Sequence, residues 1–220
     1  MDLKKNKSPP QLVLAVSKGR IFEETLELLD KSSIKILDYS KSSRKLSLDT
    51  NRKDLRILVV RAADVPTYVG YGAADLGITG KDVLMEHNSS DYYEILDLGI
   101  SRCRMMVASK VGFKATSLSI RVATKYPTVA ERYFASKGLQ AEIIKLYGSM
   151  ELAPSFGLAD QIVDLVDTGA TLRANGLEAI ELISEISAYL IVNRSSMKVH
   201  HGRVKELIHS FEKALENGHG

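Results

Sequence analysis

The sequence has almost no cysteine chemistry available to it. Cys103 is the only cysteine among 220 residues, so the chain cannot form an internal disulfide, which is typical of a protein in a reducing cytosol. The sequence also lacks a His-Glu-x-x-His motif, a cluster of zinc ligands, and a Gly-x-x-x-x-Gly-Lys-Ser/Thr loop. These absences argue against zinc hydrolases and against Walker-type nucleotide hydrolases.

Long apolar runs and a strong charge imbalance are missing as well. No run approaches the roughly 18 apolar residues that span a membrane, and the polar residues 1–10 lack the apolar core of a signal peptide. A net charge of +3 is too small to imply a nucleic-acid surface. We therefore expect a cytoplasmic protein that binds neither membrane nor nucleic acid, with residues 1–10 as a disordered lead-in.

What the sequence does contain is an alternation of apolar runs and amphipathic stretches. Residues 12–16, 55–60 and 74–79 are the clearest strands of a first block, and a weaker run at 34–37 is interpreted as another. The pattern starts again after Arg102. Strands alternating with helices at this spacing predict α/β architecture with parallel strands.

Two such blocks predict two β/α lobes with a cleft between them. The expected division assigns residues 11–103 and 184–220 to lobe I and residues 104–183 to lobe II. A final strand at 188–192 and a terminal helix follow the second block. If both return to lobe I, the chain crosses between the lobes twice, and a clamp that closes over a ligand follows.

The stretch from Gln161 to Gly176 has the form of an anion-binding loop. Its apolar beginning, residues 162–166, predicts a buried strand, and Asp167-Thr-Gly-Ala-Thr171 is small and rich in hydroxyls. The apolar spacing from Leu172 to Ile180 is typical of a helix. A strand that enters a helix through such a loop presents backbone N–H groups that favour phosphate. An ordinary strand-to-helix turn with a threonine N-cap is the alternative.

Basic side chains follow three strands of the first block. Lys18 and Arg20 come after the first strand, Arg61 follows residue 60, and Lys81 follows residue 79 closely. Arg44 precedes a strand, so its position relative to the others stays open. Ligands of open α/β sheets bind beyond the carboxyl ends of strands, where such cations suit a polyphosphate. The alternative is that they are solvated surface charges, as most lysines and arginines are.

Five stretches together resemble the ATP phosphoribosyltransferase family. They are Leu14-Ala-Val-Ser-Lys-Gly-Arg20, Arg61-Ala-Ala-Asp-Val-Pro66, Ala73-Ala-Asp-Leu-Gly-Ile-Thr-Gly80, Gly148-Ser-Met-Glu-Leu-Ala-Pro154 and Asp164-Leu-Val-Asp-Thr-Gly-Ala-Thr-Leu-Arg-Ala-Asn-Gly176. The resemblance extends from about Leu12 to the C-terminal helix. It implies a two-lobed fold like that of type II periplasmic binding proteins, in agreement with the two lobes expected above.

The resemblance also implies an activity. The family joins N1 of the adenine of ATP to C1 of phosphoribosyl pyrophosphate and releases pyrophosphate, in the first committed step of histidine biosynthesis. The chain ends soon after Phe211, which resembles the short form without the C-terminal histidine-binding domain. That form works with a regulatory subunit related to histidyl-tRNA synthetase, usually in a hetero-octamer, and a homodimer of this chain is expected. Mg²⁺ is expected to bind through the substrates, without metal ligands from the protein.

Matching positions imply roles for individual residues. Phosphoribosyl pyrophosphate would be bound by Asp164, Asp167, Thr168, Gly169, Ala170, Thr171, Leu172 and Glu151. ATP would be bound by Lys18, Arg20, Arg61, Lys81 and Tyr126. Catalysis would rest on Arg20, Arg44 and Arg61, which would stabilise charge on the departing pyrophosphate. Adenine N1 already carries a free lone pair, so no strong general base is required.

Two other functions fit parts of the pattern. A type I phosphoribosyltransferase shares the spacing of Asp164, Thr168, Gly169 and Thr171, although Val163 stands where that motif usually has its first acidic residue. A two-lobed ligand-binding or sensing domain without catalysis would have a similar fold. A secreted receptor of that kind would need a signal peptide, and a sensor would not need several basic residues near a phosphate loop.

Overall fold

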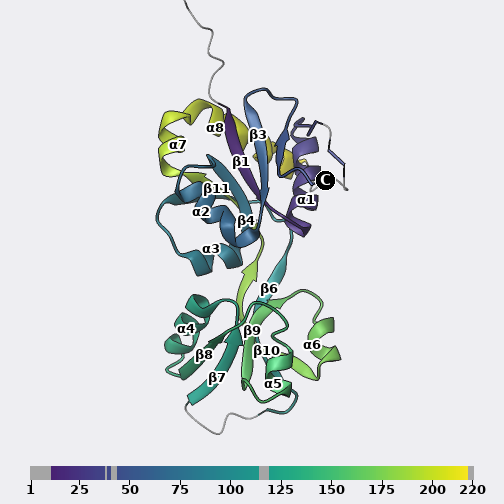
Figure 1. Cartoon of the computed structure of the whole chain (residues 1–220), viewed down its shortest axis with the longest axis vertical. Helices are drawn as coiled ribbons and strands as arrows, with labels where there is room; N and C mark the ends of the chain where they lie inside the picture. The colour runs from purple at the N-terminus through teal and green to yellow at the C-terminus, as the bar shows by residue number, and fades with distance from the viewer. Residues whose placement is uncertain (1–10, 38, 41–43, 114–118, 218–220) are drawn as a thin grey trace, which may run out of the picture. The chain divides into compact units, whose positions relative to one another are not determined.

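The computed structural model describes residues 11–37, 39–40, 44–113 and 119–217, and the expected lead-in of residues 1–10 lies outside them. The chain forms two compact units (Figure 1). Unit 1 contains the described residues up to Ser101 and from Ala188 onward, and unit 2 contains Arg102–Ser187. The structure thus divides the chain after residues 101 and 187, where the sequence analysis divided it after 103 and 183. The chain passes from unit 1 to unit 2 and back.

Unit 1 is built on a six-stranded mixed sheet in the order β2-β3-β1-β4-β11-β5. Its strands are β1 (Leu12–Ser17), β2 (Ser47–Asp49), β3 (Leu55–Val60), β4 (Leu76–Gly80), β5 (Tyr92–Asp97) and β11 (Ala188–Asn193). The neighbours β3, β1 and β4 are parallel, whereas β2 runs antiparallel to β3. Strand β11 lies between β4 and β5 and is antiparallel to both.

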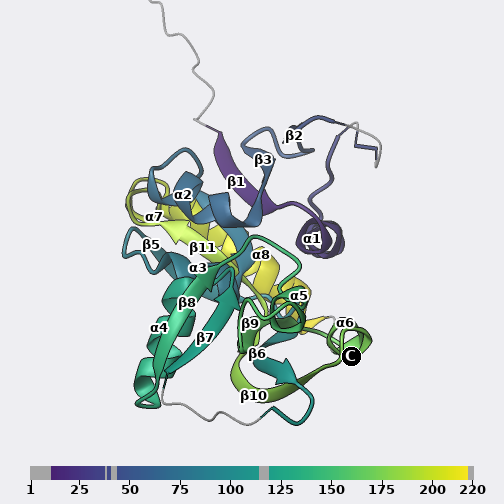
Figure 2. The ribbon, with the colours of Figure 1, turned by 60° about the horizontal axis from the view of Figure 1, so that its bottom comes forward.

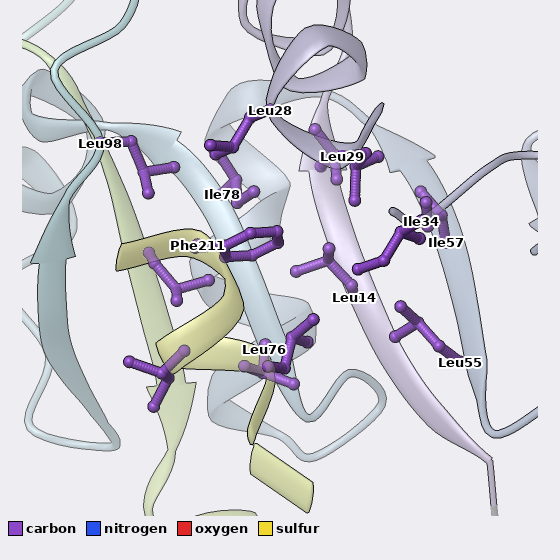
Figure 3. Close-up of a cluster of buried hydrophobic side chains, with 14 of the residues drawn as sticks. Leu14, Leu28, Leu29, Ile34, Leu55, Ile57, Leu76, Ile78, Leu98 and Phe211 are labelled. Atoms are coloured by element: carbon purple, nitrogen blue, oxygen red, sulfur yellow. The ribbon is translucent and has the colours of Figure 1, made fainter. Parts of the chain in front are cut away.

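Helices cover both faces of this sheet. They are α1 (Arg20–Lys31), the 3₁₀ turn η1 (Ala62–Asp64), α2 (Val65–Gly70), α3 (Lys81–His87), α7 (Arg194–Val199) and α8 (His201–Glu216). Figure 3 shows the core on one face, where Leu28 and Leu29 of α1 and Phe211 of α8 meet Leu14 and Ile78 of the strands. Each large side chain buried in this way contributes roughly 1.5–3 kcal/mol. Helix α1 is thereby held directly behind the end of β1.

On the other face, α2 packs against β1, β4 and β11 in a second apolar cluster. Gly77 of β4 permits the close approach, because a Cβ there would lie 2.7 Å from Cγ1 of Val65 and 2.8 Å from Cγ2 of Val69. Both valines are fully buried. The glycine of the Ala73–Gly80 stretch therefore has a packing role within unit 1.

Unit 2 is built on a five-stranded mixed sheet in the order β10-β6-β9-β7-β8. Its strands are β6 (Cys103–Lys110), β7 (Ser119–Thr124), β8 (Gln140–Lys145), β9 (Gln161–Val166) and β10 (Leu177–Ile186), and its helices are α4 (Pro127–Ser136), α5 (Leu152–Ser155) and α6 (Ala170–Ala174). Strands β9, β7 and β8 are parallel, and β6 is antiparallel to β9 and β10. Figure 2 shows α4 lying along β7 and β8.

Three expectations about local structure were wrong. The helix expected up to Ile180 ends at Ala174, because Gly176 adopts a φ of +71° and the chain then pairs with β6 as β10. The strand expected at 34–37 reduces to a single bridge between Ile36 and Thr50. Only Ile34 of that run is fully buried, so the segment has no continuous apolar face that would stabilise its pairing with a neighbouring strand. The sheets are mixed rather than purely parallel.

None of the helices among the described residues is long and apolar enough to cross a membrane.

Candidate active site

A cavity of about 180 Å³ lies beside the loop between β9 and α6 in unit 2. Its lining consists of Glu151, Asp164, Leu165, Val166, Asp167, Thr168, Gly169, Ala170, Thr171 and Leu172. All eight residues that the sequence analysis assigned to phosphoribosyl pyrophosphate are among them. The structure therefore brings Glu151, which precedes α5, to the loop that follows β9.

The loop sits at the carboxyl end of a central strand. Ile162 and Val163 of β9 are fully buried, and Oγ1 of Thr124, at the end of β7, donates a hydrogen bond of 2.7 Å to the carbonyl of Val163. The end of β7 is thus fixed to the middle of β9, three residues before β9 ends at Val166. The carboxyl end of such a strand is the edge of an α/β sheet where ligands bind.

The loop itself is a tight turn with few side chains. Gly169 adopts a φ of +73°, which disfavours any residue with a Cβ. Gly169, and not a threonine, holds the N-cap position of α6. Oγ1 of Thr168 accepts a hydrogen bond of 3.3 Å from the N–H of Ala170, the first residue of that helix. Because α6 has only five residues, its dipole is small. The polar character of the loop comes from its backbone groups, hydroxyls and carboxylates.

Two arginines that the sequence analysis did not single out bind the carbonyls of this loop. Nη1 of Arg173 donates to the carbonyl of Thr168 at 3.1 Å, and Nη2 of Arg104 donates to the carbonyl of Asp167 at 3.5 Å. Arg173 follows Gly169 by four residues, which is one helical turn, and this spacing is a signal visible in the sequence. Arg104 lies on β6, and its proximity depends on the pairing of β6 with β9.

In unit 1, three of the predicted basic residues stand at one edge of the sheet. Lys18, Arg61 and Lys81 directly follow β1, β3 and β4, which are adjacent and parallel. Their backbones therefore leave the sheet on the same side. Lys18 and Arg61 are exposed, whereas Lys81 is partly buried.

Arg44 lies near the same edge of the sheet, because the strand that follows it, β2, runs antiparallel to β3. Strand β2 is antiparallel to β3, with Ser47 opposite Leu58, and the N–H of Val59 donates to the carbonyl of Leu46 at 2.8 Å. The start of β2 therefore lies at the carboxyl end of β3, and Arg44 precedes Leu46 by two residues. The sequence left this position open, because the direction of β2 cannot be read from a short apolar pair.

Arg20 is placed by the turn between β1 and α1. Gly19 adopts φ +96° and ψ −143°, a conformation that is open almost only to glycine. Arg20 then begins α1, and its Nε lies 3.5 Å from Oε1 of Glu24 one turn further on. Below the turn, Oγ of Ser17 donates to Oγ1 of Thr79 at 3.0 Å, which ties the ends of β1 and β4 together.

The side chains of Lys81 and Tyr126 are less available to a ligand than the sequence analysis expected, because Lys81 makes contacts within the protein and Tyr126 is buried. The ammonium of Lys81 is paired with Glu94 and lies 4.9 Å from the ring centroid of Tyr189. Burial raises the pKa of Tyr189, and the charge of Asp97 raises it further. Tyr126 is only 3% exposed, and its ring forms part of the interior beside α4.

Comparison with known proteins decides the family. The HisG family model, ATP phosphoribosyltransferase, matches residues 61–213. A protein of Marinobacter nauticus named ATP phosphoribosyltransferase is 58% identical over 93% of this chain and 96% of its own length. One of the same name from Nitrosococcus oceani is 57% identical over 95% of this chain and 98% of its own length. The chain belongs to the ATP phosphoribosyltransferase family.

Solved structures agree with this membership. A chain in the ATP phosphoribosyl transferase (HisG:HisZ) complex from Thermotoga maritima superposes with a TM-score of 0.83 at 35% identity, over 94% of this chain and all of that one. The periplasmic aliphatic sulphonate binding protein SsuA from Escherichia coli superposes with a TM-score of 0.59 at 14% identity, over 94% of this chain and 73% of that one. The second likeness shows the fold alone. The chain is an α/β protein with the fold expected from the resemblance.

Membership in the ATP phosphoribosyltransferase family makes the chain a pentosyltransferase and sets aside the type I phosphoribosyltransferase alternative. Among the described residues, no group of three or more His, Cys, Asp and Glu side chains has the geometry to hold a metal ion. Three carboxylate residues, Asp164, Asp167 and Glu151, line the cavity.

Proposed function

We propose that the chain transfers the phosphoribosyl group of phosphoribosyl pyrophosphate to N1 of the adenine of ATP. In this proposal the loop of unit 2 binds the phosphoribosyl group, and the basic residues of unit 1 supply positive charge for phosphates. The observation that supports this most is the cavity beside β9, because Glu151 and the whole of Asp164–Leu172 line one cavity. A ligand with a phosphate and a diol uses both the donors and the carboxylates of that space.

In the loop, the 5-phosphate takes the backbone N–H groups and the hydroxyls of Thr168 and Thr171. Gly169 has no side chain to keep the phosphate from the backbone. Asp164 or Asp167 accepts hydrogen bonds from the ribose hydroxyls, and Glu151 completes that wall of the cavity. Anions and diols are thereby bound by different parts of one short loop, which fixes the orientation of the ribose ring.

At the basic edge, Arg20, Arg44 and Arg61 stabilise the charge that develops on the departing pyrophosphate. Guanidinium groups suit this task because they bind phosphate oxygens in pairs of parallel hydrogen bonds. Lys18 and Lys81 contribute positive charge toward the phosphates of ATP. Tyr126 is left out of this proposal, because its buried ring presents almost no surface to a nucleotide.

The chemical step needs alignment more than acid–base catalysis. The N1 lone pair of adenine forms a bond to C1 of the ribose while the bond from C1 to the pyrophosphate oxygen breaks, with inversion at C1. The electron pair leaves with pyrophosphate, and neutralising it is the principal electrostatic demand. Holding two polyanions in line supplies the rest of the rate enhancement.

In this proposal Mg²⁺ binds through the phosphates of the substrates. It prefers oxygen ligands in an octahedron and is usually bound by substrate phosphates with one or two carboxylates. Asp164, Asp167 and Glu151 line the cavity, where they would lie near an ion bound to the substrate phosphates. When bound, the ion supplies charge neutralisation on pyrophosphate, while the residues named above orient the substrates.

We propose further that the chain is of the short form and works with a regulatory partner. The support is the ATP phosphoribosyl transferase (HisG:HisZ) complex from Thermotoga maritima, in which the matching chain is covered completely by this one. In this proposal the partner is a subunit related to histidyl-tRNA synthetase, and the chain forms a homodimer that joins the partner in a hetero-octamer. Sedimentation of the purified chain with and without the partner distinguishes these assemblies.

The experiment that tests the activity mixes the chain with ATP, Mg²⁺ and phosphoribosyl pyrophosphate and follows the absorbance of N1-alkylated adenine. We expect growth of this band together with release of one pyrophosphate per product. A two-lobed binding domain without catalysis would give binding heat and no band. Absence of product both with and without the regulatory partner contradicts the proposal.

A further inference from the structure

We propose that Arg104 and Arg173 are positioning residues that orient the backbone of Asp167–Gly169 for binding phosphate. The inference rests on the proposed function of that loop. Neither arginine lines the cavity, whereas Asp167, Thr168 and Gly169 do. The two side chains therefore act on the loop without taking a place among the residues that face the ligand.

Arg104 reaches the loop from the neighbouring strand. Its Cα is paired with that of Val166, the last residue of β9, and with that of Glu185 on β10. From this position its guanidinium donates to the carbonyl of Asp167, the first residue beyond β9. The pairing of β6 with β9 therefore places Arg104 within reach of the carbonyl of Asp167.

Arg173 reaches the loop from α6, the helix that follows the turn. Its side chain folds back from α6 and donates to the carbonyl of Thr168. It also lies against Gly169, where a Cβ would come within 3.0 Å of Nη1. The absence of a side chain at Gly169 therefore favours both the backbone angle and this close approach.

Because each peptide unit is planar and trans, a hydrogen bond to its C=O also fixes the direction of the N–H in the same unit. In each peptide unit the C=O and the N–H point in opposite directions. Binding the carbonyl of Asp167 to Arg104 turns the N–H of Thr168 away from Arg104. Binding the carbonyl of Thr168 to Arg173 turns the N–H of Gly169 away from Arg173 in the same way.

The two oriented donors are available to a ligand. Among the described residues, neither the N–H of Thr168 nor that of Gly169 donates to a protein acceptor, and both residues line the cavity. Successive N–H groups that point to one side form an anion-binding concavity. By holding the two carbonyls, the arginines keep these donors oriented before phosphate arrives, which lowers the ordering cost of binding.

Titration calorimetry with phosphoribosyl pyrophosphate and Mg²⁺ tests this on the full chain. Arg173→Ala is expected to weaken affinity roughly tenfold, since a hydrogen bond from a charged donor is lost. Arg173→Gln keeps a donor without the charge and is expected to retain most of the affinity, as is Arg173→Lys. Arg104→Ala is expected to weaken affinity by a smaller factor, because its contact is longer. ATP affinity should be unchanged in all four.

The matched control is Arg132→Ala, which removes an exposed arginine from α4 in the same unit. Repeating the titrations at high salt separates orientation from charge, because salt screens only the latter. If Arg173→Gln and Arg173→Ala lose affinity equally, and salt abolishes the difference from wild type, the arginine acts by charge and the proposal is overturned.

Thr168→Ala in the same titration separates this inference from the function on which it rests. If Thr168→Ala weakens binding and the arginine variants do not, the positioning role fails alone. If all of them bind like wild type, the assignment of the loop to phosphoribosyl pyrophosphate fails, and the positioning role fails with it. Thermal unfolding of each variant identifies any loss that reflects the fold.

Discussion

The backbone N–H of Ser101 donates a hydrogen bond of 2.6 Å to Oε2 of Glu24 on α1. Ser101 is the last residue of unit 1 before the chain enters unit 2, and its φ of +52° lies in the left-handed region. The other carboxylate oxygen of Glu24 is the one that faces Nε of Arg20. One side chain therefore connects a proposed catalytic arginine with a strained residue at the crossover.

Glu24→Ala is expected to lower the free energy of unfolding by about 1–2 kcal/mol, because the N–H of Ser101 loses a charged acceptor. Glu24→Gln should cost less, since its amide oxygen still accepts that bond. Urea unfolding measures both. Glu27→Gln, an exposed residue on the same helix, is the control, and a loss there as large as that of Glu24→Ala would contradict the explanation.

Gly169→Val is expected to weaken phosphoribosyl pyrophosphate binding strongly. Valine cannot adopt a φ of +73° without strain, and its side chain would meet Arg173. Thr168→Ala should have a smaller effect, about fivefold, because it removes one hydroxyl and leaves the backbone donors. Calorimetry with each variant is the measurement. Unchanged affinity in both would refute the phosphate cradle.

Arg61→Ala is expected to lower kcat roughly tenfold or more, if the arginine stabilises charge on the departing pyrophosphate. The free energy of unfolding should change by less than about 0.5 kcal/mol, because the side chain is exposed. Steady-state kinetics and urea unfolding are compared on the same preparation. Lys53→Ala, which removes an exposed positive charge from the same unit, should leave kcat unchanged. Equal losses in stability and turnover would indicate a structural role for Arg61.

Gly77→Ala is expected to destabilise the protein by about 1–3 kcal/mol, because its methyl group would overlap Val65 and Val69. Gly202→Ala provides the contrast, since a Cβ there meets nothing within 4 Å and the residue lies in α8. It should raise stability by up to about 1 kcal/mol. Thermal unfolding of the two variants should therefore shift in opposite directions.

Asp54 is expected to contribute to loss of stability in acid. The hydrogen bond from Arg52 holds the pKa of Asp54 below its ordinary value, and Arg52 also lies 3.1 Å from Glu206 of α8. A lowered folded pKa gives stability that is present above the unfolded pKa and disappears as the pH falls through the folded one. Between about pH 5 and about pH 2, wild type should lose more stability than Asp54→Asn. Parallel curves from urea unfolding across that range would show that Asp54 does not contribute.

The sequence sufficed where local pattern and local structure coincide. The loop after β9 is continuous in the chain, so the residues that line its cavity are nearly all sequence neighbours, and only Glu151 had to be brought in from elsewhere. The edge formed by Lys18, Arg61 and Lys81 could be expected because parallel strands end on the same side. These features follow from the order of the elements.

The sequence was insufficient where pairing partners decide the outcome. The residues of β10 have an apolar spacing that suits a helix, and they form a strand because β6 offers a long antiparallel ladder. Strand β5 has mostly exposed side chains and is held by its pairing with β11. Arg44 and Arg104 acquire their positions from the direction of β2 and the register of β6, respectively. Such information is not contained in any single window of residues.

The insertion of β11 between β4 and β5 has a consequence for synthesis on the ribosome. Unit 2 is one uninterrupted segment, Arg102–Ser187, and all its strands emerge before the sheet of unit 1 has its sixth strand, β11. Until residues 188–193 are made, β4 lacks a neighbour on one side and exposes an unpaired edge, which is a site of aggregation in nascent chains. A premature stop before Ala188 should therefore yield an intact unit 2 attached to a unit 1 that proteases degrade.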